Sequence, residues 1–75
     1  MQADHIADLI RAGIPDAEVT ITDLAGDGDH YAARVVAESF RALTRTARTR
    51  AVYAALGDRM GGELHALQLT TAVPD

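Results

Sequence analysis

The 75-residue chain contains no cysteine, no tryptophan and no lysine, and it has a single phenylalanine. Without cysteine it forms no disulfide and offers no thiolate to a metal. Because there are only two tyrosines besides, the core must be built mainly from aliphatic side chains. A chain of this length buries only roughly 60% of its unfolded surface. We therefore expect one small domain over residues 1–75 that depends on regular secondary structure, on a partner, or on both.

Long apolar runs and targeting segments are also missing. No run reaches the roughly 18 apolar residues of a membrane-spanning helix, so we expect no membrane span. The first twenty residues carry three aspartates and no basic stretch, which argues against a signal peptide. We expect a cytoplasmic protein.

The sequence lacks the motifs of the common enzyme classes. The stretch Gly26-Asp27-Gly28 has neither the third glycine of a dinucleotide fingerprint nor the twelve-residue spacing of a calcium loop. Ser39 is the only serine, and nothing in the pattern pairs a base with it. We expect a protein that is not an enzyme.

The net charge of −4 conceals an uneven distribution. Residues 1–30 carry seven acidic side chains and one basic one, whereas residues 31–59 carry six arginines and two acidic side chains. An acidic chain is a poor general binder of nucleic acid, but its middle third can still form a basic patch.

Helical spacing dominates the first residues of the chain. Ile6, Leu9 and Ile10 are spaced i, i+3, i+4, which predicts a helix over residues 4–12. Gly13 is expected to end that helix in the left-handed conformation, and the proline two residues later cannot continue it.

Alternating polar and apolar residues then predict strands. The runs over residues 17–24 and 31–39 are joined by a Gly/Asp-rich turn, which is typical of an antiparallel hairpin. The remaining expected elements are a short helical turn over 40–43, a helix from the N-cap Thr44 to about Met60 ended by Gly61-Gly62, and a strand over 64–71.

The expected order is therefore α-β-β-α-α-β, an α+β fold with a three-stranded mixed sheet. A helical crossover joins the second and third strands, so these two strands should be parallel if they share a sheet. Parallel strands begin at the same edge. This places His30, just before the second strand, near His65, at the start of the third.

Two imidazoles at one sheet edge can converge on a metal, because neutral imidazole is a good ligand for iron, zinc or copper. Asp27 and Asp29 flank His30 and should favour its protonated form, which would make metal binding there sensitive to pH. The alternative is that His30 is a solvated turn residue and His65 a hydrogen-bonded strand residue.

A cluster of arginines without an acidic neighbour is the second feature of interest. Arg41, Arg45 and Arg48 are spaced i, i+4, i+7 and would share a face if the turn and the helix were continuous. Together with Arg50 they would suit DNA in a helix-turn-helix-like arrangement, a small anion, or an acidic protein surface. The alternative is that they simply solvate one side of a helix.

Several stretches, taken in order, resemble the BolA-like family over essentially the full chain. They are Gly13-Ile14-Pro15-Asp16-Ala17, Asp27-Gly28-Asp29-His30-Tyr31, Phe40 with Arg45, Arg50-Ala51-Val52-Tyr53 with Leu56, and His65-Ala66-Leu67-Gln68-Leu69-Thr70-Thr71. The resemblance implies a fold similar to class II KH domains.

The resemblance also implies a partnership with a monothiol glutaredoxin in iron–sulfur cluster handling. In that role the two proteins bridge a [2Fe–2S] cluster. The glutaredoxin gives one cysteine, glutathione gives another thiolate, and the BolA-like protein gives the remaining ligands. On this resemblance His65 is the firmer ligand and His30 the second, as in the His-loop branch of the family.

The family is further associated with transcription regulation through a helix-turn-helix-like surface, which maps to Arg45, Arg48 and Arg50. The sequence departs from the family pattern there, because Ala47 and Thr49 replace residues that are often basic or histidine. It also lacks the Gly-x-x-Gly loop that KH domains use for nucleic acid. We therefore rank DNA binding below cluster binding, and a homodimer through an exposed edge strand is a third hypothesis.

Overall fold

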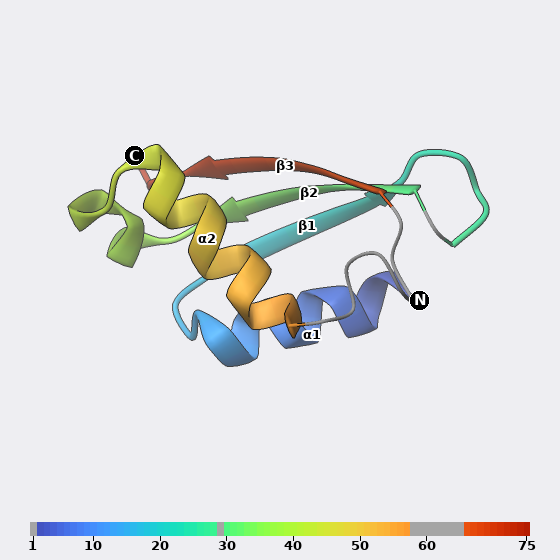
Figure 1. Cartoon of the computed structure of the whole chain (residues 1–75), viewed down its shortest axis with the longest axis horizontal. Coiled ribbons are helices and arrows are strands. Elements are labelled where there is room, and N and C mark those ends of the chain that lie inside the picture. The colour runs from blue at the N-terminus through green and yellow to red at the C-terminus, as the bar shows by residue number, and fades with distance from the viewer. Residues whose placement is uncertain (1, 29, 58–65) are drawn as a thin grey trace.

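A three-stranded sheet forms one layer of the protein and two helices, side by side, form the other (Figure 1). The computed structural model describes residues 2–28, 30–57 and 66–75. The elements are α1 (Ala3–Gly13), β1 (Glu18–Asp23), β2 (His30–Val36), the 3-10 helix η1 (Glu38–Ala42), α2 (Arg45–Leu56) and β3 (Ala66–Ala72). This is the expected α+β order, with η1 as the first of the two consecutive helices.

The sheet is mixed, as the sequence predicted. Its strand order is β1-β2-β3, with β1 antiparallel and β3 parallel to β2. His30 lies opposite Ala66 in the register of the parallel pair. The crossover through η1 and α2 therefore brings the first residues of β2 and β3 to the same edge.

Alternating side chains of the strands build the core against the helices. In β2, Tyr31, Ala33 and Val35 are buried, whereas Arg34 between them is exposed. The helices contribute apolar side chains one turn apart, as helical periodicity requires. The buried cluster consists of Ile6, Ile10, Ile14, Tyr31, Val35, Ala37, Phe40, Val52 and Leu56. The opposite face of the sheet is mostly polar, so the helices cover one face only.

The second strand ends three residues earlier than alternation predicted. Residues 31–39 were expected to be extended, but β2 ends at Val36, and Glu38 and Ser39 belong to η1. Ala37 is the last extended residue before η1, and its N–H donates to the carbonyl of Ala72 at 3.1 Å. Phe40, only 1% exposed, then turns into the core, which an extended chain would not allow.

The start of α2 agrees with the prediction from the sequence, but its end does not. Thr44 is the N-cap, and its hydroxyl oxygen accepts from the N–H of Ala47 at 3.1 Å. The helix ends at Leu56 and not near Met60, because Gly57 takes a positive φ of 66° that only glycine adopts readily. The expected stop at residues 61–62 lies outside the described part of the chain. None of the described helices is long enough and apolar enough to cross a membrane.

Gly13 serves a different purpose from the expected left-handed cap. It is the last helical residue of α1, and its φ is not positive. A Cβ atom at this position would lie 2.6 Å from the Cβ of Ala55 and 3.2 Å from its Cα. The glycine is therefore needed because α1 and α2 approach each other closely here.

We expect Gly13→Ala to lower the free energy of unfolding by about 1–3 kcal/mol, because the added methyl overpacks the contact with Ala55. Helix propensity alone predicts the opposite sign, since alanine favours a helix by about 1 kcal/mol over glycine. Urea unfolding followed by circular dichroism measures the difference. Ala55→Gly should partly rescue Gly13→Ala, whereas Ala54→Gly, at an exposed position, should not.

Candidate functional site

His30 occupies the edge where β2 and β3 begin. It is the first residue of β2, its side chain is 50% exposed, and Ala66 lies opposite it. His65 precedes Ala66 in the sequence but lies outside the described residues. The parallel pairing on which the two-histidine hypothesis depends is confirmed, and convergence of the two rings stays a prediction.

The loop before His30 is shaped by carboxylates. The Oδ1 and Oδ2 atoms of Asp23 accept from the N–H groups of Gly26 at 2.9 Å and Gly28 at 3.0 Å. Both glycines have a φ of 71°, in the left-handed region. The last residue of β1 thereby holds the loop in a fixed conformation.

Asp27 anchors His30 through both of its oxygens. The Oδ1 atom accepts from the His30 backbone N–H at 3.2 Å, and the Oδ2 atom lies 2.8 Å from Nδ1 of the ring. A carboxylate accepts the proton of Nδ1, so the neutral ring carries its lone pair on Nε2. The same arrangement orients metal-binding histidines in many proteins. The second predicted neighbour, Asp29, lies outside the described residues.

The described residues contain no group of three or more His, Cys, Asp or Glu side chains placed to hold a metal ion. His5 is exposed on α1, as expected of a surface residue. Of the three histidines, the structure therefore gives an ordered hydrogen-bonded environment to His30 and a solvent-facing position to His5.

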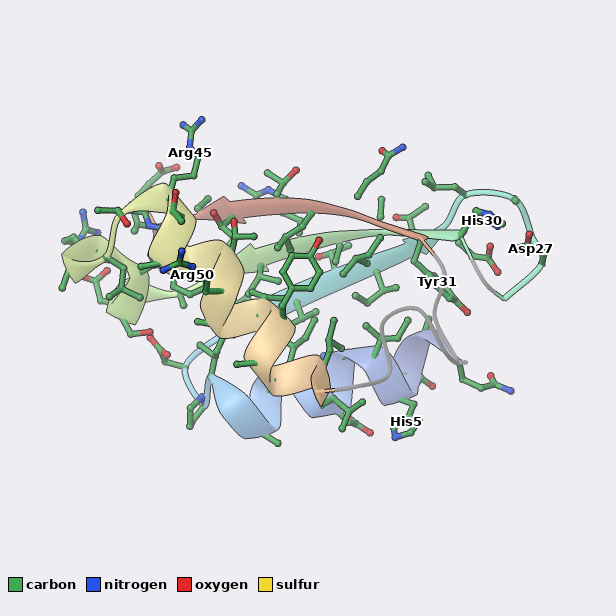
Figure 2. All side chains as sticks on the ribbon, viewed as in Figure 1. His5, Asp27, His30, Tyr31, Arg45 and Arg50 are labelled. Carbon is green, nitrogen blue, oxygen red and sulfur yellow. The ribbon has the colours of Figure 1, made fainter. Side chains whose placement is uncertain are left out.

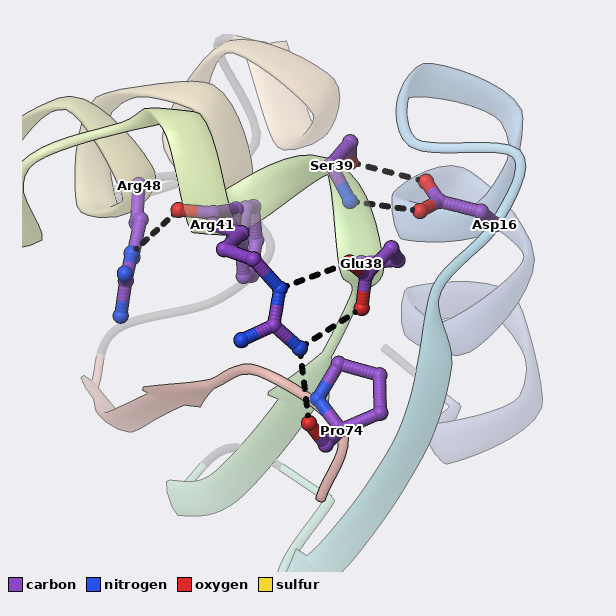
Figure 3. Close-up of polar contacts among 7 residues, drawn as sticks. Asp16, Glu38, Ser39, Arg41, Arg48 and Pro74 are labelled. Atoms are coloured by element: carbon purple, nitrogen blue, oxygen red, sulfur yellow. Dashed lines mark hydrogen bonds and ion pairs between the residues drawn. The ribbon is translucent and has the colours of Figure 1, made fainter.

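The four arginines of the central segment do not share one helical face. Arg41 belongs to η1, and the extended residues Leu43 and Thr44 separate it from α2. The guanidinium of Arg41 donates to both carboxylate oxygens of Glu38, at 2.7 and 2.9 Å, and to the carbonyl of Pro74 at 3.0 Å (Figure 3). This bidentate contact lowers the pKa of Glu38 below its ordinary value. The turn and the helix are therefore not continuous, so the condition for Arg41 to share a face with Arg45 and Arg48 is not met.

Arg48 is a structural residue. Its Nε–H donates to the carbonyl of Phe40 at 2.9 Å (Figure 3). The same Nε–H also donates to the carbonyl of Leu43 at 3.1 Å. These carbonyls lie at the end of η1, where the Phe40 carbonyl also accepts from the backbone N–H of Leu43 at 2.9 Å. Arg48 thus ties η1 to the second turn of α2.

Arg45 and Arg50 are exposed and form no ion pair with any residue that the structure describes. Five residues in a helix turn by about 140°, so the two side chains point in different directions. Figure 2 shows both at the opposite end of the molecule from His30 and Asp27. DNA binding by Arg45, Arg48 and Arg50 together stays a prediction, and one of the three already holds two backbone carbonyls.

Asp16 fastens η1 to the turn after α1. Its oxygens accept from the backbone N–H and from the hydroxyl of Ser39, both at 2.9 Å (Figure 3). These bonds favour the ionised carboxylate and lower the pKa of Asp16 below its usual 3.8, the backbone N–H of Ser39 having the larger effect.

Comparison with known proteins assigns this arrangement of elements to a family. A family model described as "BolA: BolA-like protein" matches residues 13–75. The chain belongs to the BolA-like family.

The chain is 35% identical over 72 residues to UV-induced protein uvi31 of Schizosaccharomyces pombe, and the match covers 95% of this chain and 62% of that protein. It is 33% identical over 70 residues to an uncharacterized protein in the rpoN-murA intergenic region of Acinetobacter guillouiae, covering 92% of this chain and 81% of that one.

Solved structures agree with the fold. A bolA protein homologue from Coxiella burnetii is 35% identical, with a TM-score of 0.77, and the match covers 100% of this chain and 94% of that one. BolA1 from Arabidopsis thaliana is 25% identical, with a TM-score of 0.82, covering 96% and 90%. BolA-like proteins are not enzymes, in agreement with the expectation from the sequence.

The sequence analysis did not predict the structural roles of two carboxylates in this BolA-like chain, those of Asp23 and Asp16. Asp23 is followed by glycines three and five residues later, a pattern that could have indicated a side chain accepting from a tight turn. The contact between Asp16 and Ser39 spans 23 residues and leaves no local signal.

We expect Arg48→Ala to lower the free energy of unfolding by about 1–2 kcal/mol, because two carbonyls lose their charged donor. Arg50→Ala, in the same helix but exposed, should change it by less than about 0.5 kcal/mol. Urea unfolding of both variants makes the comparison. Equal losses would contradict the structural role of Arg48.

The Asp16 contact should make stability depend on pH. Because the folded-state pKa is lowered, its contribution is present above about pH 4 and is lost as pH falls through the folded-state pKa. Asp16→Asn should therefore unfold at lower urea concentration at neutral pH, and the difference from the unsubstituted protein should shrink in acid. Ser39→Ala, which keeps the stronger backbone donor, should retain part of this pH dependence. If the stability difference between Asp16→Asn and the unsubstituted protein did not change with pH, the Asp16 contact would not be the source of the pH dependence.

Proposed function

We propose that this BolA-like protein is an accessory or adaptor in iron–sulfur cluster handling, acting in the cytoplasm. In this proposal His30 and His65 ligate a [2Fe–2S] cluster shared with a monothiol glutaredoxin. The assignment of the chain to the His-loop branch of the family rests on His30 in the hairpin.

The observation that carries the proposal is the parallel pairing of β2 with β3. His30 lies opposite Ala66, and His65 is the residue before Ala66 in the sequence. Neighbouring strands are roughly 4.8 Å apart, which suits two ligands of one site. Because His65 is bonded to Ala66, which lies opposite His30, the strand register supports a location near His30 for both imidazoles.

The hydrogen bond between Asp27 and His30 supports the same function. It orients the ring, as carboxylate partners orient metal-binding histidines in other proteins. Histidine ligation on one iron raises the reduction potential of a [2Fe–2S] cluster above that of all-thiolate ligation. Asp27 is therefore a positioning residue in this proposal.

The missing ligands must come from elsewhere, because two histidines make an incomplete site and the chain contains no cysteine. A monothiol glutaredoxin with bound glutathione supplies the two thiolates that complete the ligand set of the cluster. The hydrogen-bonded loop keeps His30 half exposed at the end of the sheet, where a partner can approach.

The test is reconstitution of the protein with a cluster-loaded monothiol glutaredoxin and glutathione, followed by visible absorption and circular dichroism. We expect His65→Ala and His30→Ala to change the spectrum of the complex, because each removes one nitrogen ligand. His5→Ala is the matched control, since it removes an exposed histidine from α1, and its spectrum should equal that of the unsubstituted protein.

Identical spectra for His65→Ala and the unsubstituted protein would refute the ligand assignment. Size-exclusion chromatography of the same samples separates ligation from association. If the complex forms without the cluster and the His variants alter only the spectrum, the histidines are ligands and not merely contact residues.

A further inference from the structure

An opening lies between the first turns of α2 and the C-terminal half of β3. Its volume is about 340 Å³, and it is lined by Arg45 and Thr49 of α2 and by Leu69, Thr70 and Thr71 of β3. Figure 2 shows Arg45 projecting from α2 above the end of β3. One wall of the opening is thus a helix carrying a cation, and the other is a strand.

That strand is an edge strand of the described sheet, and three of its residues line the opening. β3 is last in the order β1-β2-β3. The carbonyl of Ala72 accepts from Ala37 just beyond β2, so the backbone of Ala72 faces β2. Because backbone direction alternates along a strand, the N–H and C=O groups of Leu69 and Thr71 point away from β2. Such a row is a template for another strand.

The charge facing this edge is positive. Arg45 makes no hydrogen bond or ion pair through its guanidinium with the residues that the structure describes. Its neighbours Arg41 and Arg48 are already held by Glu38 and by backbone carbonyls. No acidic residue occurs in α2. The hydroxyl of Thr49 donates to the carbonyl of Arg45 at 3.2 Å and so presents lone pairs, not its proton, to a ligand.

We propose that this opening binds an extended acidic segment of another protein, which pairs with β3 as a fourth strand. The backbone groups of Leu69 and Thr71 bond to the segment, and Arg45 binds a carboxylate on it. Backbone pairing gives affinity in such complexes, and side-chain contacts give selectivity. A carboxylate suits the planar guanidinium, which can bind it through two hydrogen bonds.

The proposed strand site is separate from the histidine edge. Ala66 begins β3 and Thr71 lies five residues further on, which corresponds to roughly 16 Å along a strand. The proposal goes beyond cluster ligation and does not depend on it. Loss of peptide binding and loss of the cluster spectrum are therefore distinguishable results.

The probe is a synthetic fluorescein-labelled peptide, Thr-Val-Glu-Val-Thr-Val, added to the full chain labelled with nitrogen-15. We expect saturable binding by fluorescence anisotropy and slower hydrogen exchange of the Leu69 and Thr71 amides. Arg45→Glu should weaken binding about fivefold or more, because an exposed ion pair is lost and a repulsion replaces it. Arg45 is the first residue of α2, where glutamate suits the helix dipole, so this variant should fold.

Arg34→Glu is the matched control. Arg34 is exposed on the other face of the sheet and belongs to a different opening, so the same charge change there should leave the affinity unchanged. A peptide with lysine in place of glutamate should bind at least about fivefold more weakly. Amide spectra of both variants confirm that they are folded.

Other results would overturn the proposal. Binding without protection of Leu69 and Thr71, or complete competition by sodium acetate, would show a site for a simple anion. Slower hydrogen exchange of β1 amides in place of β3 amides would show that the peptide pairs with the other edge of the sheet. Protection that rises with protein concentration in the absence of peptide would identify a second copy of this chain as the occupant. Displacement of the peptide by a random DNA duplex at 150 mM salt, with Arg48→Ala and Arg50→Ala weakening binding as much as Arg45→Glu, would favour a nucleic-acid surface.

Discussion

The parallel pairing of β2 with β3 determines where every candidate functional group lies. A strand that returns parallel to its predecessor needs a long connection, and here η1 and α2 lie within it. That connection carries the arginines to one end of the sheet, while the starts of both strands, with His30, lie at the other. The same pairing leaves β3 at an edge. The proposed histidine site and the proposed strand site are therefore two consequences of one topology.

The helical layer holds this arrangement through a few contacts that tolerate little change. Gly13 allows α1 to approach Ala55, and Val52 and Leu56 of α2 are fully buried. At the other end, Arg48 and Asp16 fasten η1 through hydrogen bonds to or from its backbone. A short chain without disulfides thus relies on close helix packing together with charged groups that satisfy backbone atoms where helices end.

Periodicity predicted much of this fold, because strand and helix patterns depend on neighbouring residues. The alternation at Val19 and Ile21, the buried face of β2 and the N-cap Thr44 were all readable from sequence. Element ends were less predictable. Ser39 continues an alternating pattern, but its bonds to Asp16, 23 residues away, place it in η1.

The candidate sites show the same division between local and distant information. The edge position of His30 followed from the element order, and its contact with Asp27 from their closeness in the chain. The role of Arg48 did not follow, because helical spacing gives the direction of a side chain and not its partner. Likewise, only the three-dimensional structure shows that Arg45 lines one opening together with residues of the edge strand β3.

The loop before His30 separates binding chemistry from folding. Its conformation depends on Asp23, Asp27 and two glycines, all exposed or half-exposed, and it adds no side chain to the apolar cluster. The loop can therefore be re-engineered with a small expected change in the free energy of unfolding. If His30 ligates a cluster as proposed, exchanging its imidazole for a thiol or a carboxylate would alter the metal preference of the site while leaving the packing of the apolar cluster intact.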